Sequence, residues 1–372
     1  MSKFRCPRRD FLKMTAAGAA GLAIMQPGKA QAAAGTGWPS TGTMEINPNI
    51  SNLRVVSCHD PLMITNQTGL GNSAWNFAGW NAAVNATRIM NNLDQMAMQL
   101  SQTTTPDAAW AAIFQKPAAK TWAQVNVAIK VNLLSTANQP RLAVVQKICQ
   151  VLNGFGVPGS QIVIFDCSTG STGNNQQMGA WVSSFSQGAA GSTKIPGVTS
   201  NGNASLGGYT SVAVPGLSNG SQNCATAIAN GTVDIIVNIA VNKSHSPYAG
   251  GTTLCLKNHF GTFAPDHTPN DAAVPGNILS MNKSGQIVGG TPVRQQICIV
   301  DALWGDKNGT PSGNPTYRCD RLVMGTFAGA VDYQTVMNIQ RVAPMNSTLC
   351  TSYPTFLTSF GYATTDTGLQ WV

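Results

Sequence analysis

One stretch of the chain alternates between strand and helix patterns, and it limits the possible folds more than any other feature. Residues 125–133 (VNVAIKVNL) and 161–166 (QIVIFD) are apolar runs typical of buried strands. Between them, residues 140–152 carry apolar side chains at helical spacing and stop before Gly154. Two strands joined by a crossover helix predict parallel neighbours with a right-handed connection. We therefore expect an α/β fold with a largely parallel sheet flanked by helices, with two lobes around a central cleft left open.

The other elements are predicted from the same two periodicities. Residues 168–208 are rich in Gly, Ser, Thr and Asn, and predict the longest irregular insertion. Asp332 is expected near the start of the last helix. We expect strands at 53–57, 209–214, 233–241, 296–301 and, as an edge strand, 322–326, and helices at 81–100, 107–114, 221–230 and 271–281.

The first residues have the pattern of an export signal. Residues 1–13 are basic, 14–25 are weakly apolar, and Ala30-Gln31-Ala32 offers a small-residue cleavage site. The pair Arg8-Arg9 resembles the twin-arginine export consensus. We expect 1–32 to be a twin-arginine signal peptide and 33–372 to be a single α/β domain. The export machinery is then a partner, and the mature chain is periplasmic or secreted, with no transmembrane segment because no later apolar run is long enough.

The charge balance of the chain without residues 1–32 differs from that of the whole chain. The whole chain has 22 basic and 14 acidic residues, but six of the basic ones lie within 1–32. The remainder is only mildly basic and has no basic patch interleaved with aromatic residues. These features exclude nucleic acid as an expected partner.

Eight cysteines follow the leader, and none of them belongs to a C-x-x-C pair. A ferredoxin-type iron–sulfur cluster and a zinc ribbon are therefore not expected. The even number permits disulfides in an oxidising compartment, but spacing alone does not pair them.

Polar residues capable of chemistry gather between 233 and 263. The apolar run at 233–241 leads into Lys243 and His245, and a second segment brings Lys257, Asn258 and His259. Lysines at the ends of buried strands are costly unless they are paired or reach a ligand. The sequence leaves open whether they pair with Asp166 or Asp301, or instead converge on a ligand.

The order of these pieces resembles the family catalogued as domain of unknown function 362, over about residues 125–340. The lysine–histidine segments, K-x-H followed by K-N-x-x-G, are the most specific part of the resemblance. The chain departs from the family pattern in lacking Asp-Pro before Asp332 and in lacking the ferredoxin-type cysteines of some members. The resemblance implies a fold and a shared polar site, and no activity. The matching stretches are VAIKVNLL (127–134), VNIAVNKSH (237–245), GGTTLCLKNHFGTF (250–263), CIVDALWGDKNGTP (298–311) and MGTFAGAVDYQTVMNI (324–339).

We expect these residues to meet in one cleft that binds an anionic small molecule. The binding residues would be Lys130, Asn132, Lys243, Lys257 and Asn258, and the catalytic residues would be His245, His259 and Asp301.

Three alternatives remain open for the same residues. A divalent metal could be held by the histidines and Asp301, with Asp166 or His267. The pocket could bind an anion or cofactor without catalysis, in a redox or assembly protein. A nucleophilic mechanism could use Ser244, Ser246 or Cys167, although no G-x-S-x-G motif is present.

Overall fold

The computed structural model describes residues 45–66, 70, 77–134, 138–166, 199–200, 206–217, 219–246, 251–264, 274–308, 314–350, 353–365 and 367–372. The predicted signal peptide, Cys167, His267 and most of the predicted insertion lie outside these residues. All described residues belong to one unit, Gly35–Val372. No described helix is both long and apolar enough to cross a membrane.

A mixed sheet organises the described part of the chain, with the strand order β11-β1-β10-β9-β7-β2-β3-β4 and with β8 paired to β7. Strands β4, β3, β2, β7 and β9 run parallel to one another, whereas β10 is antiparallel to both of its neighbours. The predicted α/β class with a largely parallel sheet is confirmed, and a division into two lobes is not. The strands are β1 (Arg54–His59), β2 (Val127–Lys130), β3 (Ile162–Phe165), β4 (Thr199–Ser200), β7 (Ile235–Ser244), β8 (Thr252–Thr253), β9 (Gln295–Asp306), β10 (Tyr317–Gly325) and β11 (Gly368–Trp371).

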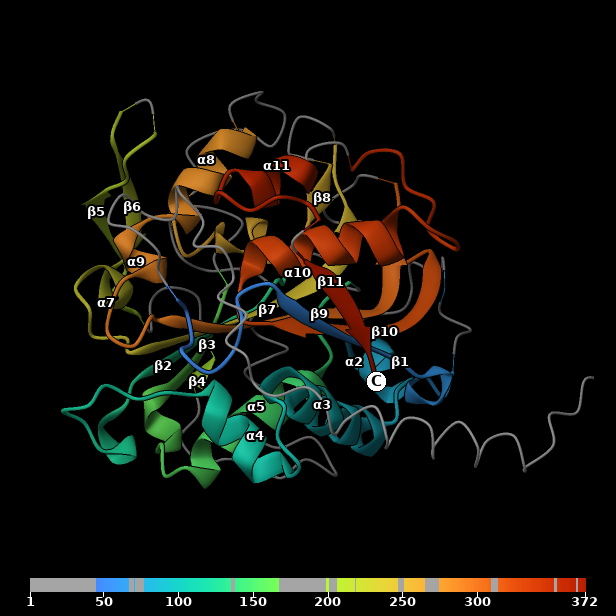
Figure 1. The fold of residues 1–372 in the computed structure, drawn as a ribbon, viewed down its shortest axis with the longest axis horizontal. Coiled ribbons are helices and arrows are strands. Elements are labelled where there is room, and N and C mark those ends of the chain that lie inside the picture. Colours follow the sequence, from blue (N-terminus) through green and yellow to red (C-terminus); the bar gives the residue numbers. More distant parts are fainter. Residues whose placement is uncertain are drawn as a thin grey trace, which may run out of the picture. The chain divides into compact units, whose positions relative to one another are not determined.

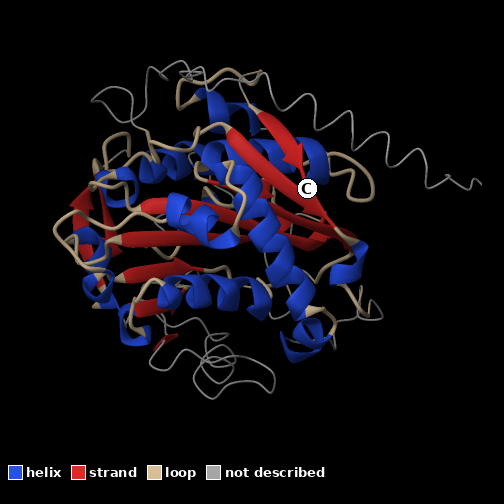
Figure 2. Ribbon diagram, turned by 60° about the horizontal axis from the view of Figure 1, so that its bottom comes forward, coloured by secondary structure: helices blue, strands red, loops and turns tan. Residues whose placement is uncertain are grey.

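Helices cover both faces of this sheet (Figures 1 and 2). In Figure 1, α3, α4 and α5 lie below the sheet, and α8, α10 and α11 lie above it. Each face has its own apolar core, because alternate strand residues point to opposite sides. The helices are α2 (Phe77–Ala82), α3 (Ala86–Ser101), α4 (Pro106–Ile113), α5 (Leu142–Gly154), α7 (Thr226–Ala229), α8 (Val274–Asn282), α9 (Gly285–Val288), α10 (Ala328–Thr335) and α11 (Tyr353–Thr358).

Local sequence accounts well for the α3 helix. The Asn85 side chain accepts a hydrogen bond from the Arg88 amide at 3.0 Å and so caps the first turn. The apolar residues that predicted this helix, including Ile89, Leu93 and Leu100, are all buried against the sheet. Burial of such a stripe is the main source of helix stability in a folded protein.

Three predictions of local structure are wrong. Residues 221–230 were expected to be helical, but Ser221–Ala225 is strand β6, which pairs antiparallel with β5 (Tyr209–Ala213). Only the four residues of α7 are helical there, because pairing with β5 outweighs a weak helical pattern.

The other two errors concern β10 and α10. The β10 strand is not at an edge, since β9 and β1 flank it on its two sides. Its partner β1 lies more than 250 residues earlier in the chain, so no local pattern shows the pairing. Helix α10 begins at Ala328 rather than at Asp332.

Candidate functional site

The carboxyl ends of β2 and β3 hold a buried ion pair. Lys130, the last residue of β2, donates from its Nζ to Asp166 Oδ1 at 2.9 Å and to the Val131 carbonyl at 2.7 Å. Both charged side chains are inaccessible to solvent. The second Asp166 oxygen accepts from the Leu133 amide at 2.6 Å. Lys130 is thus paired within the protein, which is one of the two outcomes that the sequence leaves open.

A second buried network ties the short 3-10 helix η6 (Lys257–His259) to the sheet. Asn258 donates to Asn238 Oδ1 at 2.8 Å and accepts from Lys130 Nζ at 3.4 Å. His259 contacts Gln295 Oε1 through Nε2 at 2.6 Å and Thr262 Oγ1 through Nδ1 at 3.1 Å.

Both ring nitrogens of His259 therefore have protein partners. Burial lowers the pKa of its imidazole to about 4, although the hydrogen bond to Gln295 Oε1 opposes this shift. A neutral imidazole with Nε2–H donating to Gln295 and Nδ1 accepting from Thr262 accounts for these two contacts. Through these contacts His259 and Asn258 hold η6 against the sheet. Their predicted contacts with a ligand stay predictions.

The β7–β8 hairpin assembles a different group, in which His245 Nε2 and Thr253 Oγ1 have no hydrogen-bond partner among the described residues. Lys243 and Thr253 are directly opposite each other in the antiparallel pair, so their side chains share a face. His245 follows two residues later, and its amide donates to the Gly251 carbonyl at 2.9 Å. Thr253 is buried, and its Oγ1 has no hydrogen-bond partner among the described residues. Thr253 is absent from the predicted site residues, because only the strand register places it beside Lys243.

His245 is held as a hydrogen-bond donor. Its Nδ1 accepts from the Ser246 amide at 2.8 Å. A backbone amide can only donate, so Nδ1 must carry the lone pair, and the network assigns the proton of the neutral ring to Nε2. This Nε2 is buried and has no hydrogen-bond partner among the described residues. Burial, then the charges of Lys257 and Lys243, lower the pKa of His245 to about 3, so the ring is neutral near pH 7.

Lys257 brings a buried amine to this group without a counter-charge. The residue is 7 % exposed. Among the described residues, its Nζ has no hydrogen-bond or ion-pair partner, and it lies 5.7 Å from the centre of the Phe260 ring. Burial, then the charge of Lys243, lower its pKa well below the usual value. Such a group is costly to bury, and the cost falls when an anion lies beside it.

Lys243 differs from Lys257 because it has a partner. Its Nζ donates to Asn132 Oδ1, just beyond the end of β2, at 2.8 Å. Burial lowers its pKa to about 7, whereas the charges of Asp166 and Asp306 oppose that shift. Of the two lysines, Lys243 is the one placed to retain a proton near neutral pH.

Residues outside the lysine–histidine group fix the segment that carries Lys257. The Asp332 carboxylate accepts from the Cys255 and Leu256 amides at 2.8 Å each, directly before η6. Burial raises the pKa of Asp332 to about 7, although both amides oppose the shift. Gly251 is also required, since a Cβ there would lie 1.9 Å from the Leu349 carbonyl oxygen.

Asp301 belongs to another cluster. It accepts from the Arg141 amide at 2.6 Å and pairs with the Arg141 guanidinium, with Nε 3.8 Å from Oδ2. That guanidinium lies over the rings of Trp80 and Trp304, at 5.9 and 5.4 Å from their centres. Burial raises the pKa of Asp301, and the charge of Arg141 opposes the rise. Asp301 is thus engaged with Arg141, and its predicted catalytic role stays a prediction.

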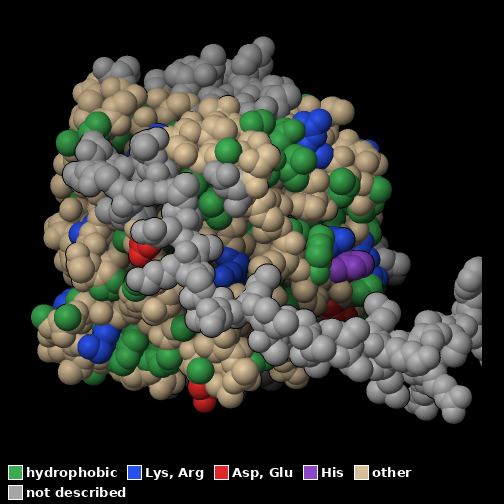
Figure 3. Space-filling view, in the orientation of Figure 1, with side chains coloured by type: hydrophobic (Ala, Val, Ile, Leu, Met, Phe, Trp, Pro, Cys, Tyr) green, Lys and Arg blue, Asp and Glu red, His purple; other side chains and the backbone are tan. Residues whose placement is uncertain are grey.

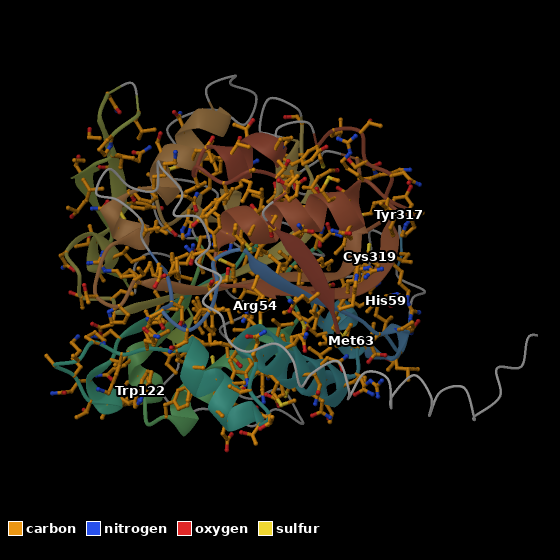
Figure 4. The ribbon with its side chains drawn as sticks, viewed as in Figure 1. Arg54, His59, Met63, Trp122, Tyr317 and Cys319 are labelled. Atoms are coloured by element: carbon orange, nitrogen blue, oxygen red, sulfur yellow. The ribbon has the colours of Figure 1, made fainter. Side chains whose placement is uncertain are left out.

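The proposed metal ligands do not form a group in the described part of the chain. No three His, Cys, Asp or Glu side chains among the described residues come together in a way that could hold a metal ion. The seven described cysteines are buried and free. His59 lies on β1, opposite Arg321 in the antiparallel pair with β10. Figure 4 labels Cys319 in the same region.

Lysine and arginine side chains are scattered over the face of the molecule drawn in Figure 3. The cationic group described above is therefore a local feature of buried residues, and not part of a broad basic surface on that face. Figure 3 does not display it, because Lys243 and His245 are almost wholly inaccessible.

The fold and the site define an α/β protein with a mostly parallel sheet and a buried lysine–histidine group at its strand ends. A family model described as "Domain of unknown function (DUF362)" matches residues 127–337, which is more than half of the chain. The chain belongs to this family, as its motifs predict. Searches of curated proteins and of solved structures found no match.

Proposed function

We propose that the chain binds a small anionic molecule at the group formed by Lys243, His245, Thr253 and Lys257, called the lysine–histidine site below. The observation that carries the proposal is the buried Nε2–H of His245, which has no acceptor among the described residues. A buried donor without an acceptor costs about 1–3 kcal/mol. An oxygen of a carboxylate or phosphate group would remove that cost.

The charges of the site support an anion over a cation. Two lysines lower the pKa of His245, and Lys243 also lowers that of Lys257, so the groups lie within electrostatic range of each other. A divalent cation here would be repelled by the Lys243 ammonium group. It would also need the Nε2 lone pair of His245, and this would place a proton on Nδ1, opposite the Ser246 amide donor.

The tautomer also defines what His245 could do to a bound molecule. A neutral ring with Nε2–H can donate to a carbonyl or carboxylate oxygen and stabilise negative charge there, but it cannot accept a proton at that nitrogen. We therefore propose a donor role for His245 within an enzyme acting on an anionic small molecule. Binding without catalysis remains the second candidate, since the same unsatisfied donors would serve either function.

Titration of the purified protein with phosphate and with acetate tests this proposal. Calorimetry should detect one site, and the ligand that binds should raise the unfolding temperature as expected for a ligand of the folded state. Thr253→Val removes one unsatisfied hydroxyl while keeping the shape of the side chain. We expect it to weaken binding by about 10-fold, equivalent to one hydrogen bond to a charged group.

Lys257→Met and His245→Phe should weaken binding at least as much as Thr253→Val. The matched control is Lys147→Met, because Lys147 pairs with Asp94 on the helical layer at 2.7 Å. Wild-type protein that binds neither anion overturns the proposal, as does binding that is unchanged in all three site variants.

We also propose that the chain is exported through the twin-arginine pathway, on the basis of Arg8-Arg9 and the apolar run that follows. Changing Arg8 and Arg9 together to lysine should leave the uncleaved protein in the cytoplasm. Unchanged export of that variant, or cleavage far from residue 32, contradicts this proposal.

A further inference from the structure

The two lysines of the lysine–histidine site differ in their hydrogen-bond partners. Anion binding alone does not require this difference. Lys243 donates to Asn132 Oδ1 at 2.8 Å and lies near two acidic residues. Lys257 is 7 % exposed and has no hydrogen-bond or acidic partner within the described residues. When two amines share one low-polarity site, the proton stays on the better-solvated amine. Lys257 is then the neutral amine of the pair.

A lysine amine that is buried, neutral and next to a cationic group is a nucleophile towards carbonyl compounds. Among the described residues, Lys257 Nζ has no hydrogen-bond partner, and its nearest ring contact is Phe260 at 5.7 Å. Its backbone is fixed by the Asp332 carboxylate, which accepts from the Cys255 and Leu256 amides. The amine is thus positioned by the fold and not carried on a loose surface chain.

We propose that Lys257 forms an imine with the carbonyl group of a short oxo carboxylate whose carboxylate occupies the lysine–histidine site. This inference rests on the proposed function, since the carboxylate needs Lys243, the His245 Nε2–H and the Thr253 hydroxyl. A short oxo acid is proposed because Lys257 and the two anion-binding side chains Lys243 and His245 influence one another electrostatically.

The reaction needs no oxidant or reductant. The Lys257 nitrogen attacks the carbonyl carbon, and the C=O π electron pair moves to oxygen, which takes up a proton. The resulting carbinolamine loses that oxygen as water while the carbon–nitrogen double bond forms. Amine, carbonyl compound and one proton thus give a protonated imine and one water. The protonated imine places a positive charge on the Lys257 nitrogen, next to the bound carboxylate.

Borohydride trapping with pyruvate tests the inference. Borohydride reduces the imine to a stable secondary amine, and peptide mass spectrometry then identifies the modified lysine. An ordinary lysine of pKa about 10.4 is neutral in only about one molecule in 250 at pH 8. Lys257 should therefore carry on the order of tenfold more adduct than Lys147, which lies in a partly exposed ion pair.

Lys257→Arg is the matched variant, because it keeps a cationic side chain and removes the nucleophilic amine. It should give no adduct in the η6 peptide. Lactate, which carries a carboxylate but no carbonyl group, separates this inference from the proposed function. If lactate binds but pyruvate with borohydride leaves no adduct at Lys257, the imine is overturned and the anion site stands. If neither lactate nor pyruvate binds, the anion site itself is overturned, and the imine with it.

Discussion

Replacing Lys243 by methionine should reduce the rise in stability that the wild-type protein shows above about pH 7. Burial lowers the pKa of Lys243 to about 7, whereas a lysine in the unfolded chain keeps a pKa of about 10.4. Between these values the unfolded chain binds one more proton at this position than the folded protein. The free energy of unfolding therefore rises with pH by about 1.4 kcal/mol per unit, and the rise ends near the unfolded pKa.

Other groups limit the pH range in which this slope can be measured. The pKa of Lys257 is also lowered, so it adds to the slope in the same direction. The buried thiol of Cys58 has its pKa raised to about 11, and above about pH 9 such thiols make stability fall with pH. Below pH 6.5 the two buried histidines titrate in the unfolded chain. The informative window is therefore from about pH 7 to about pH 8.5.

Urea unfolding at these two pH values, in buffers free of phosphate and carboxylates, measures the effect. Lys243 alone should contribute a gain of about 2 kcal/mol, and Lys243→Met should lose that part of the gain. The variant also leaves Asn132 Oδ1 without its donor, which changes the absolute stability but not the slope. Lys147→Met should keep the wild-type slope. A flat wild-type profile, or a slope as steep in Lys243→Met as in the wild type, refutes the reasoning.

Three further predictions concern the buried charges around the site. Lys130→Met leaves the carboxylate of Asp166 buried without its cation and should cost about 3–5 kcal/mol in urea unfolding, so a loss below about 1 kcal/mol would count against the pair. Arg141→Met should cost about 3 kcal/mol near neutral pH and clearly less near pH 4, because protonation then neutralises Asp301; an equal loss at both pH values contradicts this. Asp332, whose folded pKa of about 7 exceeds its unfolded value of about 3.9, contributes a fall in stability as the pH rises from about 4 to 7. Asp332→Asn should remove this fall between pH 5 and 7, and an unchanged profile in urea unfolding would argue against it.

The parts of the fold that depend on nearby residues could be predicted from the sequence. The β2–α5–β3 unit follows from local periodicity, because its two strands pair with each other and with β7 in parallel. The errors fall where pairing decides the structure. Strand β6 is defined by its hairpin with β5, and β10 becomes an internal strand only because β1 returns to pair with it.

The site illustrates the same limit at the level of single side chains. Lys130 and Lys243 look alike in the sequence, since both interrupt or follow an apolar run. Only the fold shows that Asp166 neutralises Lys130, whereas Lys243 meets a neutral amide. Thr253 could not be identified from its neighbours in the chain, because its place beside Lys243 depends on the β7–β8 register.

The central claim is that His245 offers a buried Nε2–H to an anion, and nitrogen NMR of ¹⁵N-labelled histidine tests it most directly. The spectrum of the ligand-free protein should show a neutral His245 ring with its proton on Nε2, and His245→Phe assigns the signal by removing it. Addition of acetate or phosphate should shift the Nε2 resonance while that of His259, whose nitrogens already have protein partners, changes little. A proton on Nδ1, or an Nε2 resonance that no anion moves, would contradict the account.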